Sequence, residues 1–178
     1  GKTTTAVNLA AALGQCGKRV LLVDIDPQGN STSGVGVDRR RIRSTIYEVL
    51  IEETPAASVI VGTEFDNLYL LPSSMDLAGA ELELVEKKER EGTLKKALLP
   101  VKEKFDFILI DCPPSLGMIT TNALTASDTI LVPIQCEYYA LEGLSQLMNS
   151  VRRVKRQYNP HLELEGVLLT MYDGRLNL

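Results

Sequence analysis

The amino-acid sequence predicts an α/β fold in which a mainly parallel, twisted sheet carries helices on both faces. Segments with helical spacing of apolar residues alternate with short apolar runs along the 178 residues, and strands separated by helices favour a parallel sheet. Two apolar runs, RVLLVD at 19–24 and FDFILID at 105–111, are continuous, as in strands that are buried on both faces. A Gly-Lys-Thr tripeptide directly before the first helical segment is typical of the same class.

The individual helices and strands are predicted from apolar spacing and from breaker residues. The first helix is expected over 3–16, where Ala6, Leu9 and Leu13 have helical spacing and Gly17 provides a stop. Gly, Ser, Thr and Asn fill 27–36, which predicts a loop. The other helices are expected at 45–50, 76–88, 93–104 (interrupted near Pro100), 119–126 and 139–158, and the other strands at 67–71, 129–133 and 164–171.

Composition and charge exclude several classes of protein. The formal net charge is −4, so contact with a nucleic acid would need a local basic patch. The 3 cysteines, Cys16, Cys112 and Cys136, are scattered and accompanied by a single histidine, which argues against a zinc or disulfide framework. No apolar stretch approaches the roughly 18 residues that span a bilayer, and the opening residues lack the signal-peptide pattern. We therefore expect one cytoplasmic domain over 1–178 that has no association with a membrane.

The residues Gly1-Lys2-Thr3 resemble the end of a phosphate-binding loop. A helix N-terminus presents unpaired N–H groups and the positive end of the helix dipole to phosphates. In such loops the lysine ammonium reaches the β- and γ-phosphates and the hydroxyl ligates Mg²⁺. The tripeptide alone fits a surface lysine at a helix start equally well, so its interpretation depends on the other motifs.

Three carboxylates follow the two continuous apolar runs. Asp24 and Asp26 lie two residues apart where the first run ends, and side chains at i and i+2 of an extended chain face the same way. Asp111 ends the second run and precedes Cys112-Pro113-Pro114, whose prolines stiffen the next loop. Ligands of open α/β folds bind at this edge of the sheet, and a strand-end aspartate holds Mg²⁺ in P-loop NTPases. The alternative for all three is a turn or capping aspartate.

Taken together, five segments resemble the ParA/Soj family of chromosome- and plasmid-partitioning ATPases, most closely the chromosomal, Soj-type members. In chain order they are GKTTTAVNLAAAL, RVLLVDIDPQGNSTSGVG, FDFILIDCPPSLG, PIQCEYYALEGL and GVLLTMYDGR. Related ATPases such as MinD share the first and third motifs but lack the DPQGN and QCEYYALEG wording. The resemblance extends over nearly the whole chain and implies a P-loop NTPase fold.

The resemblance implies roles at the phosphate end. Gly1 and Lys2 are expected to bind the nucleotide phosphates, with Lys2 also assisting catalysis. Thr3 is expected to ligate Mg²⁺ and to contact the nucleotide, and Thr4 to touch the α-phosphate.

It also implies roles for the strand-end residues. Asp26 is expected to position the attacking water, and Asp24 to support the water shell of Mg²⁺ near the nucleotide. Asp111 is expected to hold Mg²⁺ through water. Pro113 is expected to contribute to nucleotide binding within the second switch loop, 111–117.

Basic residues in three places are candidates for DNA contact. Arg175, in TMYDGR, occupies a position that resembles a DNA-contacting arginine of the family. Arg152 and Arg153 lie with Lys155 and Arg156 on the last predicted helix, and a third group comprises Arg39, Arg40, Arg41 and Arg43. Such contacts reach phosphates without reading sequence. For both clusters the alternative is a solvated face, and cations near a helix C-terminus also complement its dipole.

The sequence departs from the family pattern at its ends. The family's phosphate loop reads K-G-G-x-G-K-T, of which the last three residues are present. The family's signature lysine, its preceding strand and its C-terminal part are missing. The resemblance thus implies an ATPase in the intact protein, and no ATPase activity is expected of this segment alone.

The resemblance implies a Mg²⁺-dependent ATPase whose ATP-bound homodimer binds DNA non-specifically and drives chromosome or plasmid segregation. A ParB/Spo0J-like centromere-binding partner would stimulate hydrolysis, and the protein would be cytoplasmic and associated with the nucleoid. One alternative is a membrane-associated, MinD-like positioning ATPase. Another is a nucleotide-dependent DNA-binding regulator with negligible turnover, against which Asp26 argues because a water-positioning carboxylate serves only hydrolysis.

Overall fold

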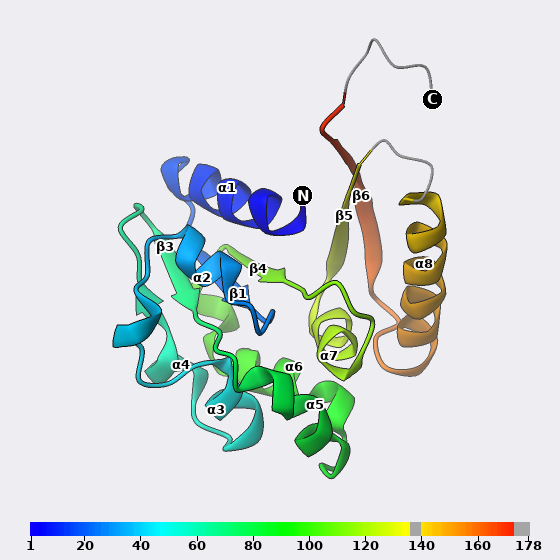
Figure 1. Cartoon of the computed structure of the whole chain (residues 1–178), viewed down its shortest axis with the longest axis horizontal. Helices are drawn as coiled ribbons and strands as arrows, with labels where there is room; N and C mark the ends of the chain where they lie inside the picture. The colour runs from blue at the N-terminus through cyan, green and yellow to red at the C-terminus, as the bar shows by residue number, and fades with distance from the viewer. Residues whose placement is uncertain (136–139, 173–178) are drawn as a thin grey trace.

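The computed structural model describes residues 1–135 and 140–172 (Figure 1). Four strands form one sheet in the order β2-β3-β1-β4, in which only β2 runs antiparallel, and two further strands form a separate parallel pair. The strands are β1 (Val20–Asp24), β2 (Val61–Gly62), β3 (Leu68–Leu71), β4 (Phe107–Asp111), β5 (Thr129–Gln135) and β6 (Glu163–Thr170). The predicted mainly parallel α/β fold is confirmed.

The helices alternate with the strands along the chain. They are α1 (Lys2–Gln15), α2 (Asn30–Gly34), α3 (Ile46–Ile51), α4 (Ala56–Val59), α5 (Leu77–Val85), α6 (Thr93–Leu98), α7 (Met118–Ala126) and α8 (Ala140–Gln157), with 3-10 turns η1 (Arg39–Arg41), η2 (Arg90–Gly92) and η3 (Leu99–Lys104). None of these helices is both long and apolar enough to cross a membrane, as far as the described residues extend.

Helices cover both faces of the four-stranded sheet (Figure 1). On one face, Ala10 of α1 packs in a cluster with Val20 and Leu22 of β1. On the other, side chains of α3, α5, α6 and α7 pack in a cluster with Leu21 and Val23. Because successive residues of a strand point to opposite faces, β1 contributes side chains to both clusters. All 5 of its residues are buried.

The prediction that 105–111 is a strand buried on both faces is wrong in part. Phe107 of β4 is 43% exposed, and only Asp111 of the strand is fully buried. β1 lies between β3 and β4, whereas β4 is hydrogen-bonded only to β1 among the described strands, and β5 only to β6. Helix α1 contacts both β4 and β5 and so joins the two sheets. The side chains of β4 are therefore less buried than its apolar composition predicts.

The predicted loop over 27–36 is also wrong in part, because Asn30–Gly34 form the short helix α2. Two of its residues, Ser31 and Thr32, are fully buried. The backbone N–H of Thr32 donates to Asp24 Oδ2 at 2.7 Å, so a carboxylate from β1 satisfies a free donor in the first turn of the helix. The contact with β1, rather than any local propensity, accounts for this helix.

Candidate active site

Two parallel strands bring two of the predicted aspartates together. β1 and β4 pair in a register that places Asp24 directly beside Asp111 at their carboxyl ends. The backbone continues the pairing beyond the strands, since Ile25 N–H donates to the carbonyl of Asp111 at 3.0 Å. The predicted convergence of these residues at one edge of the sheet is confirmed, and the residues lie where open α/β folds bind their ligands.

The carboxylate of Asp24 is fully buried and fully occupied. Its Oδ2 accepts hydrogen bonds from the backbone N–H and the hydroxyl of Thr32, each at 2.7 Å, and its Oδ1 accepts from the backbone N–H of Asp26 at 3.2 Å. The pKa of Asp24 is raised to about 6, chiefly by burial and to a smaller extent by the neighbouring Asp111. The hydrogen bonds that the carboxylate accepts act in the opposite direction. An unneutralised charge at this position is therefore costly.

Asp26 and Asp111 differ from Asp24 because each keeps one oxygen available. Asp26 Oδ1 accepts from the backbone N–H of Gln28 at 3.0 Å, and Asp111 Oδ2 accepts from the Ser31 hydroxyl at 2.7 Å. Within the described part of the chain, neither Asp26 Oδ2 nor Asp111 Oδ1 accepts a hydrogen bond. These two oxygens can therefore accept a hydrogen bond from water, whereas both oxygens of Asp24 are engaged.

Ser31 and Thr32 are contacts of the paired aspartates that sequence reasoning missed. Each hydroxyl donates to one of the paired aspartates, Ser31 to Asp111 and Thr32 to Asp24. Both residues were included in a segment assigned as a polar loop, where serine and threonine are common. Only their complete burial distinguishes them from the exposed Ser33 on the same helix.

The amino terminus of α1 provides the basic side of the site. Gly1 is the N-cap, and no side chain within residues 1–135 and 140–172 accepts a hydrogen bond from the first turn. Lys2 and Thr4 are exposed and Thr3 is half-buried. This turn can therefore present backbone N–H groups to an anion.

The pKa of the Cys112 thiol depends on three charged groups near the site. Burial raises its pKa to about 12, Asp111 and Asp26 act in the same direction, and Lys2 opposes them. Lys2 from α1 and the two carboxylates therefore lie close enough to act on one atom. The charge of Lys2 thus acts on the same buried thiol as the charges of Asp111 and Asp26.

The same region fits a nucleotide with Mg²⁺, but not a metal site made of side chains alone. In residues 1–135 and 140–172, no group of three or more His, Cys, Asp or Glu side chains is arranged to hold a metal ion. The oxygen donors present are the Thr3 hydroxyl and the strand-end carboxylates. Mg²⁺ binds to such sites through a few oxygens, keeping several waters and using substrate phosphates as its other ligands.

Comparisons with known proteins decide the family. A family model described as "AAA domain" matches residues 1–164. The chain is 56% identical over its whole length to the sporulation initiation inhibitor protein Soj of Bacillus subtilis, covering 70% of that protein. It is 53% identical over its whole length to the chromosome partitioning protein ParA of Myxococcus xanthus, covering 63% of it. The chain belongs to the ParA/Soj family of chromosome-partitioning ATPases.

A solved structure supports the fold of this ParA/Soj-family chain. The crystal structure of a protein named cobyrinic acid a,c-diamide synthase from Mycobacterium smegmatis superposes with a TM-score of 0.93 at 43% identity, over 98% of this chain and 71% of that one. That protein was determined with ADP and magnesium bound. The expectation of a P-loop NTPase fold is thus confirmed.

The remaining predicted site residues of the ParA/Soj-family chain lie in three places. Pro113 is buried directly after the paired Asp111, whereas the next proline, Pro114, is exposed. Arg152 and Arg153 are exposed on α8, where Arg152 donates to Asn149 Oδ1 at 3.2 Å. Arg175 lies outside the described residues.

Proposed function

We propose that residues 1–178 are a single domain, the nucleotide-binding core of a Mg²⁺-dependent ATPase whose ATP-bound homodimer binds DNA non-specifically and drives chromosome or plasmid segregation. The observation that carries the proposal is the pairing of Asp24 with Asp111 at the carboxyl ends of β1 and β4. Membership of the ParA/Soj family supports the proposed role in chromosome or plasmid segregation.

In this function the amino terminus of α1 binds the phosphates. Gly1 and Thr4 bind through the helix N-terminus, and Lys2 neutralises charge on the β- and γ-phosphates. Thr3 ligates Mg²⁺, and Asp111 uses its free Oδ1 to bind a water of the metal. Bound Mg²⁺ supplies charge neutralisation of the phosphates.

The hydrogen bonds of Asp26 and Asp24 indicate different roles for these two residues. Asp26 has a free Oδ2 and so positions and polarises the attacking water. Asp24 has no free oxygen, so it acts indirectly by fixing Thr32 and the backbone of Asp26 next to the water shell of Mg²⁺. Pro113 restrains the loop that follows Asp111, so that the loop responds as a unit to the γ-phosphate.

The ATP-bound state is the one that dimerises and binds DNA, and hydrolysis ends it. Arg175, Arg152 and Arg153 contact DNA phosphates, independently of sequence. A ParB/Spo0J-like centromere-binding protein stimulates hydrolysis, and the cycle takes place in the cytoplasm on the nucleoid. ATP turnover thus acts as the timer of a binding cycle.

The test measures ATP turnover and ATP-dependent binding to non-specific duplex DNA by the full-length protein. Asp26→Ala should lower turnover by about a hundredfold or more while ATP-dependent DNA binding persists, because only the water-positioning group is lost. Arg175→Ala should weaken DNA binding and reduce its salt dependence.

Wild-type turnover no higher than that of Asp26→Ala would instead identify a regulator without hydrolysis. Failure to bind DNA at low salt with ATP would reject partitioning, and binding to anionic vesicles would then favour the MinD-like alternative.

A further inference from the structure

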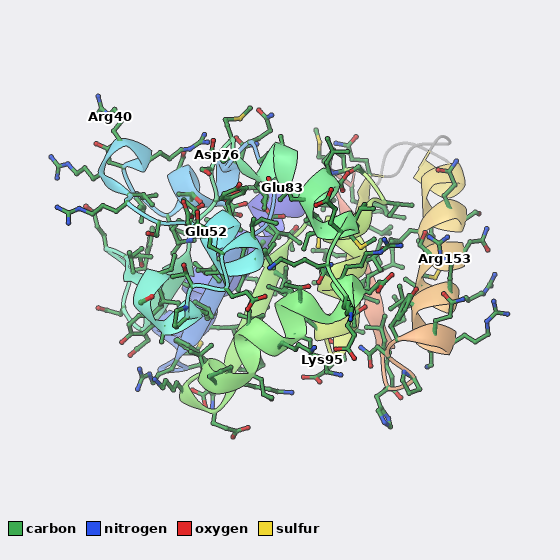
Figure 2. All side chains as sticks on the ribbon, turned by 90° about the horizontal axis from the view of Figure 1, so that it is seen from below. Arg40, Glu52, Asp76, Glu83, Lys95 and Arg153 are labelled. Atoms are coloured by element: carbon green, nitrogen blue, oxygen red, sulfur yellow. The ribbon has the colours of Figure 1, made fainter. Side chains whose placement is uncertain are left out.

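Four arginines occupy five consecutive positions of a chain whose net charge is −4. Arg39, Arg40 and Arg41 form the 3-10 turn η1, and Arg43 follows it closely. We call these four residues the arginine turn. Figure 2 shows Arg40 at one end of the molecule and Arg153, on α8, toward the other. The arginine turn is therefore a basic surface separate from the one on α8.

Only part of the charge on the arginine turn is neutralised by ion pairs. Asp38 pairs with Arg40 at 3.0 Å and with Arg41 at 3.7 Å, and both arginine side chains remain almost 90% exposed (89% and 88%). Arg39 and Arg43 form no ion pair with any residue in the described part of the chain. The guanidinium groups of Arg39 and Arg43 thus keep their net positive charge, with two more exposed beside them.

A cavity of about 340 Å³ lies against the arginine turn. Arg39 and Arg43 line it together with Ser73, whose Oγ is buried without a hydrogen-bond partner within residues 1–135 and 140–172. Two carboxylates also line the cavity, and each accepts hydrogen bonds from neutral donors. Glu48 accepts from the backbone and hydroxyl of Thr45, and Asp76 accepts from a serine hydroxyl. Three arginines of the turn, Arg39, Arg40 and Arg43, outnumber these two carboxylates in the wall.

The arginine turn is connected to the loop that carries Asp26. Arg39 Nη1 donates to the carbonyl of Gln28 at 2.7 Å, and the N–H of Gln28 donates to Asp26 Oδ1 at 3.0 Å. The guanidinium of Arg39 lies over Gly29, where a Cβ would come within 2.9 Å of Arg39 Cζ. Since Gly29 has a φ of 63°, the close approach depends on glycine for two reasons.

A second connection runs from the cavity to Asp24. The backbone N–H of Ser73 donates to the Thr32 hydroxyl at 3.1 Å, and that hydroxyl donates to Asp24 Oδ2 at 2.7 Å. Asp24, the last residue of β1, and Asp26, just beyond it, are therefore each held through one intermediate residue by a residue that lines the cavity.

We propose that the arginine turn contacts backbone phosphates of duplex DNA and that, through the Arg39–Gln28 hydrogen bond, bound DNA alters the rate of ATP turnover at Asp26. This inference rests on the proposed function, to which it adds a second DNA-contacting surface and a route of regulation. An extended polyanion fits better than a small anion, because Arg39, Arg40 and Arg43 line the cavity whereas the exposed Arg41 lies outside its lining. Phosphate contacts of this kind need positive charge and planar donors, and no base readout.

The first experiment measures the salt dependence of ATP-dependent binding of full-length protein to random-sequence duplex DNA. Arg43→Gln should bind more weakly, with the slope of log K against log salt reduced by about 0.9, the value for one lost phosphate contact. Lys95→Gln removes the same charge at a site remote from the turn (Figure 2) and should keep the wild-type slope. Unfolding midpoints of all variants establish that each one is folded.

The second experiment measures ATP turnover with and without DNA. DNA should change wild-type turnover, and Arg39→Gln should abolish that change, because the contact with Gln28 is gone. An unchanged slope for Arg43→Gln, in a wild-type protein that does bind DNA, would overturn the inference and leave the proposed function standing. Turnover of Arg39→Gln that still responds to DNA like the wild type would overturn the coupling. A wild-type protein that ignores DNA would reject the proposed function and this inference with it.

Discussion

The Ser31 hydroxyl donates to Asp111 Oδ2 at 2.7 Å although the two residues are 80 positions apart in the sequence. The equivalent bond from the adjacent Thr32 reaches Asp24, which lies beside Asp111 in the sheet. The short helix α2 thus places one hydroxyl on each carboxylate of the pair. This arrangement holds the two buried carboxylates in position.

Thr32→Val should destabilise the full-length protein by about 1–3 kcal/mol, because it removes a donor to Asp24 and the acceptor for the N–H of Ser73. Urea denaturation would measure the loss. Ser33→Ala is the matched control on the same helix, since Ser33 is exposed, and it should change stability by less than about 0.5 kcal/mol. Equal effects of the two substitutions would contradict the assigned role of Thr32.

The buried Asp24 should make the magnesium-free protein less stable as pH rises. Its pKa is about 6 in the folded protein and 3.8 in the reference state. The folded state thus favours the neutral acid, and the penalty for ionisation is absent below pH ~4 and complete above pH ~6. The free energy of unfolding of the wild type relative to Asp24→Asn should fall by roughly 3 kcal/mol between these limits. Denaturation at several pH values in EDTA tests this, and a difference that does not vary with pH would refute it.

Lys2→Ala should weaken binding of ATP by about ten- to a hundredfold, the range for loss of one charged hydrogen bond. The reason is that Lys2 is the cation at the free N-terminus of α1, next to Asp111 and Asp26. Equilibrium titration of a fluorescent ATP analogue into the full-length protein would measure the affinity. Lys18→Ala, an exposed lysine beyond the other end of α1, is the control and should bind like the wild type.

Two glycines in helices should respond to alanine in opposite directions. A Cβ at Gly14 of α1 would lie 2.3 Å from the backbone carbonyl oxygen of Asp66, whereas a Cβ at Gly143 of α8 meets nothing within 4 Å. Gly14→Ala should therefore cost about 1–3 kcal/mol through overpacking. Gly143→Ala should add about 0.5–1 kcal/mol because alanine favours the helix. Thermal unfolding of both variants measures the two effects, and a stabilised Gly14→Ala would show that the approach to Asp66 is not tight.

The amino-acid sequence by itself determined the class of the fold and the position of most elements. The spacing of apolar residues predicted α1, β1 and α7 to within about two residues, since periodicity is a local property. It also determined that Asp24 and Asp111 end apolar strands, and parallel pairing then brings them to one edge.

Only the tertiary structure decided which side chains hold those aspartates and how far each strand is buried. The helix α2 forms in a segment of loop composition because Asp24, from a different element, accepts from its first turn. β4 has the composition of a central strand but is half exposed, because burial depends on neighbouring strands and not on the strand itself. Contacts between residues 80 positions apart, such as Ser31 and Asp111, leave no periodic trace in the sequence.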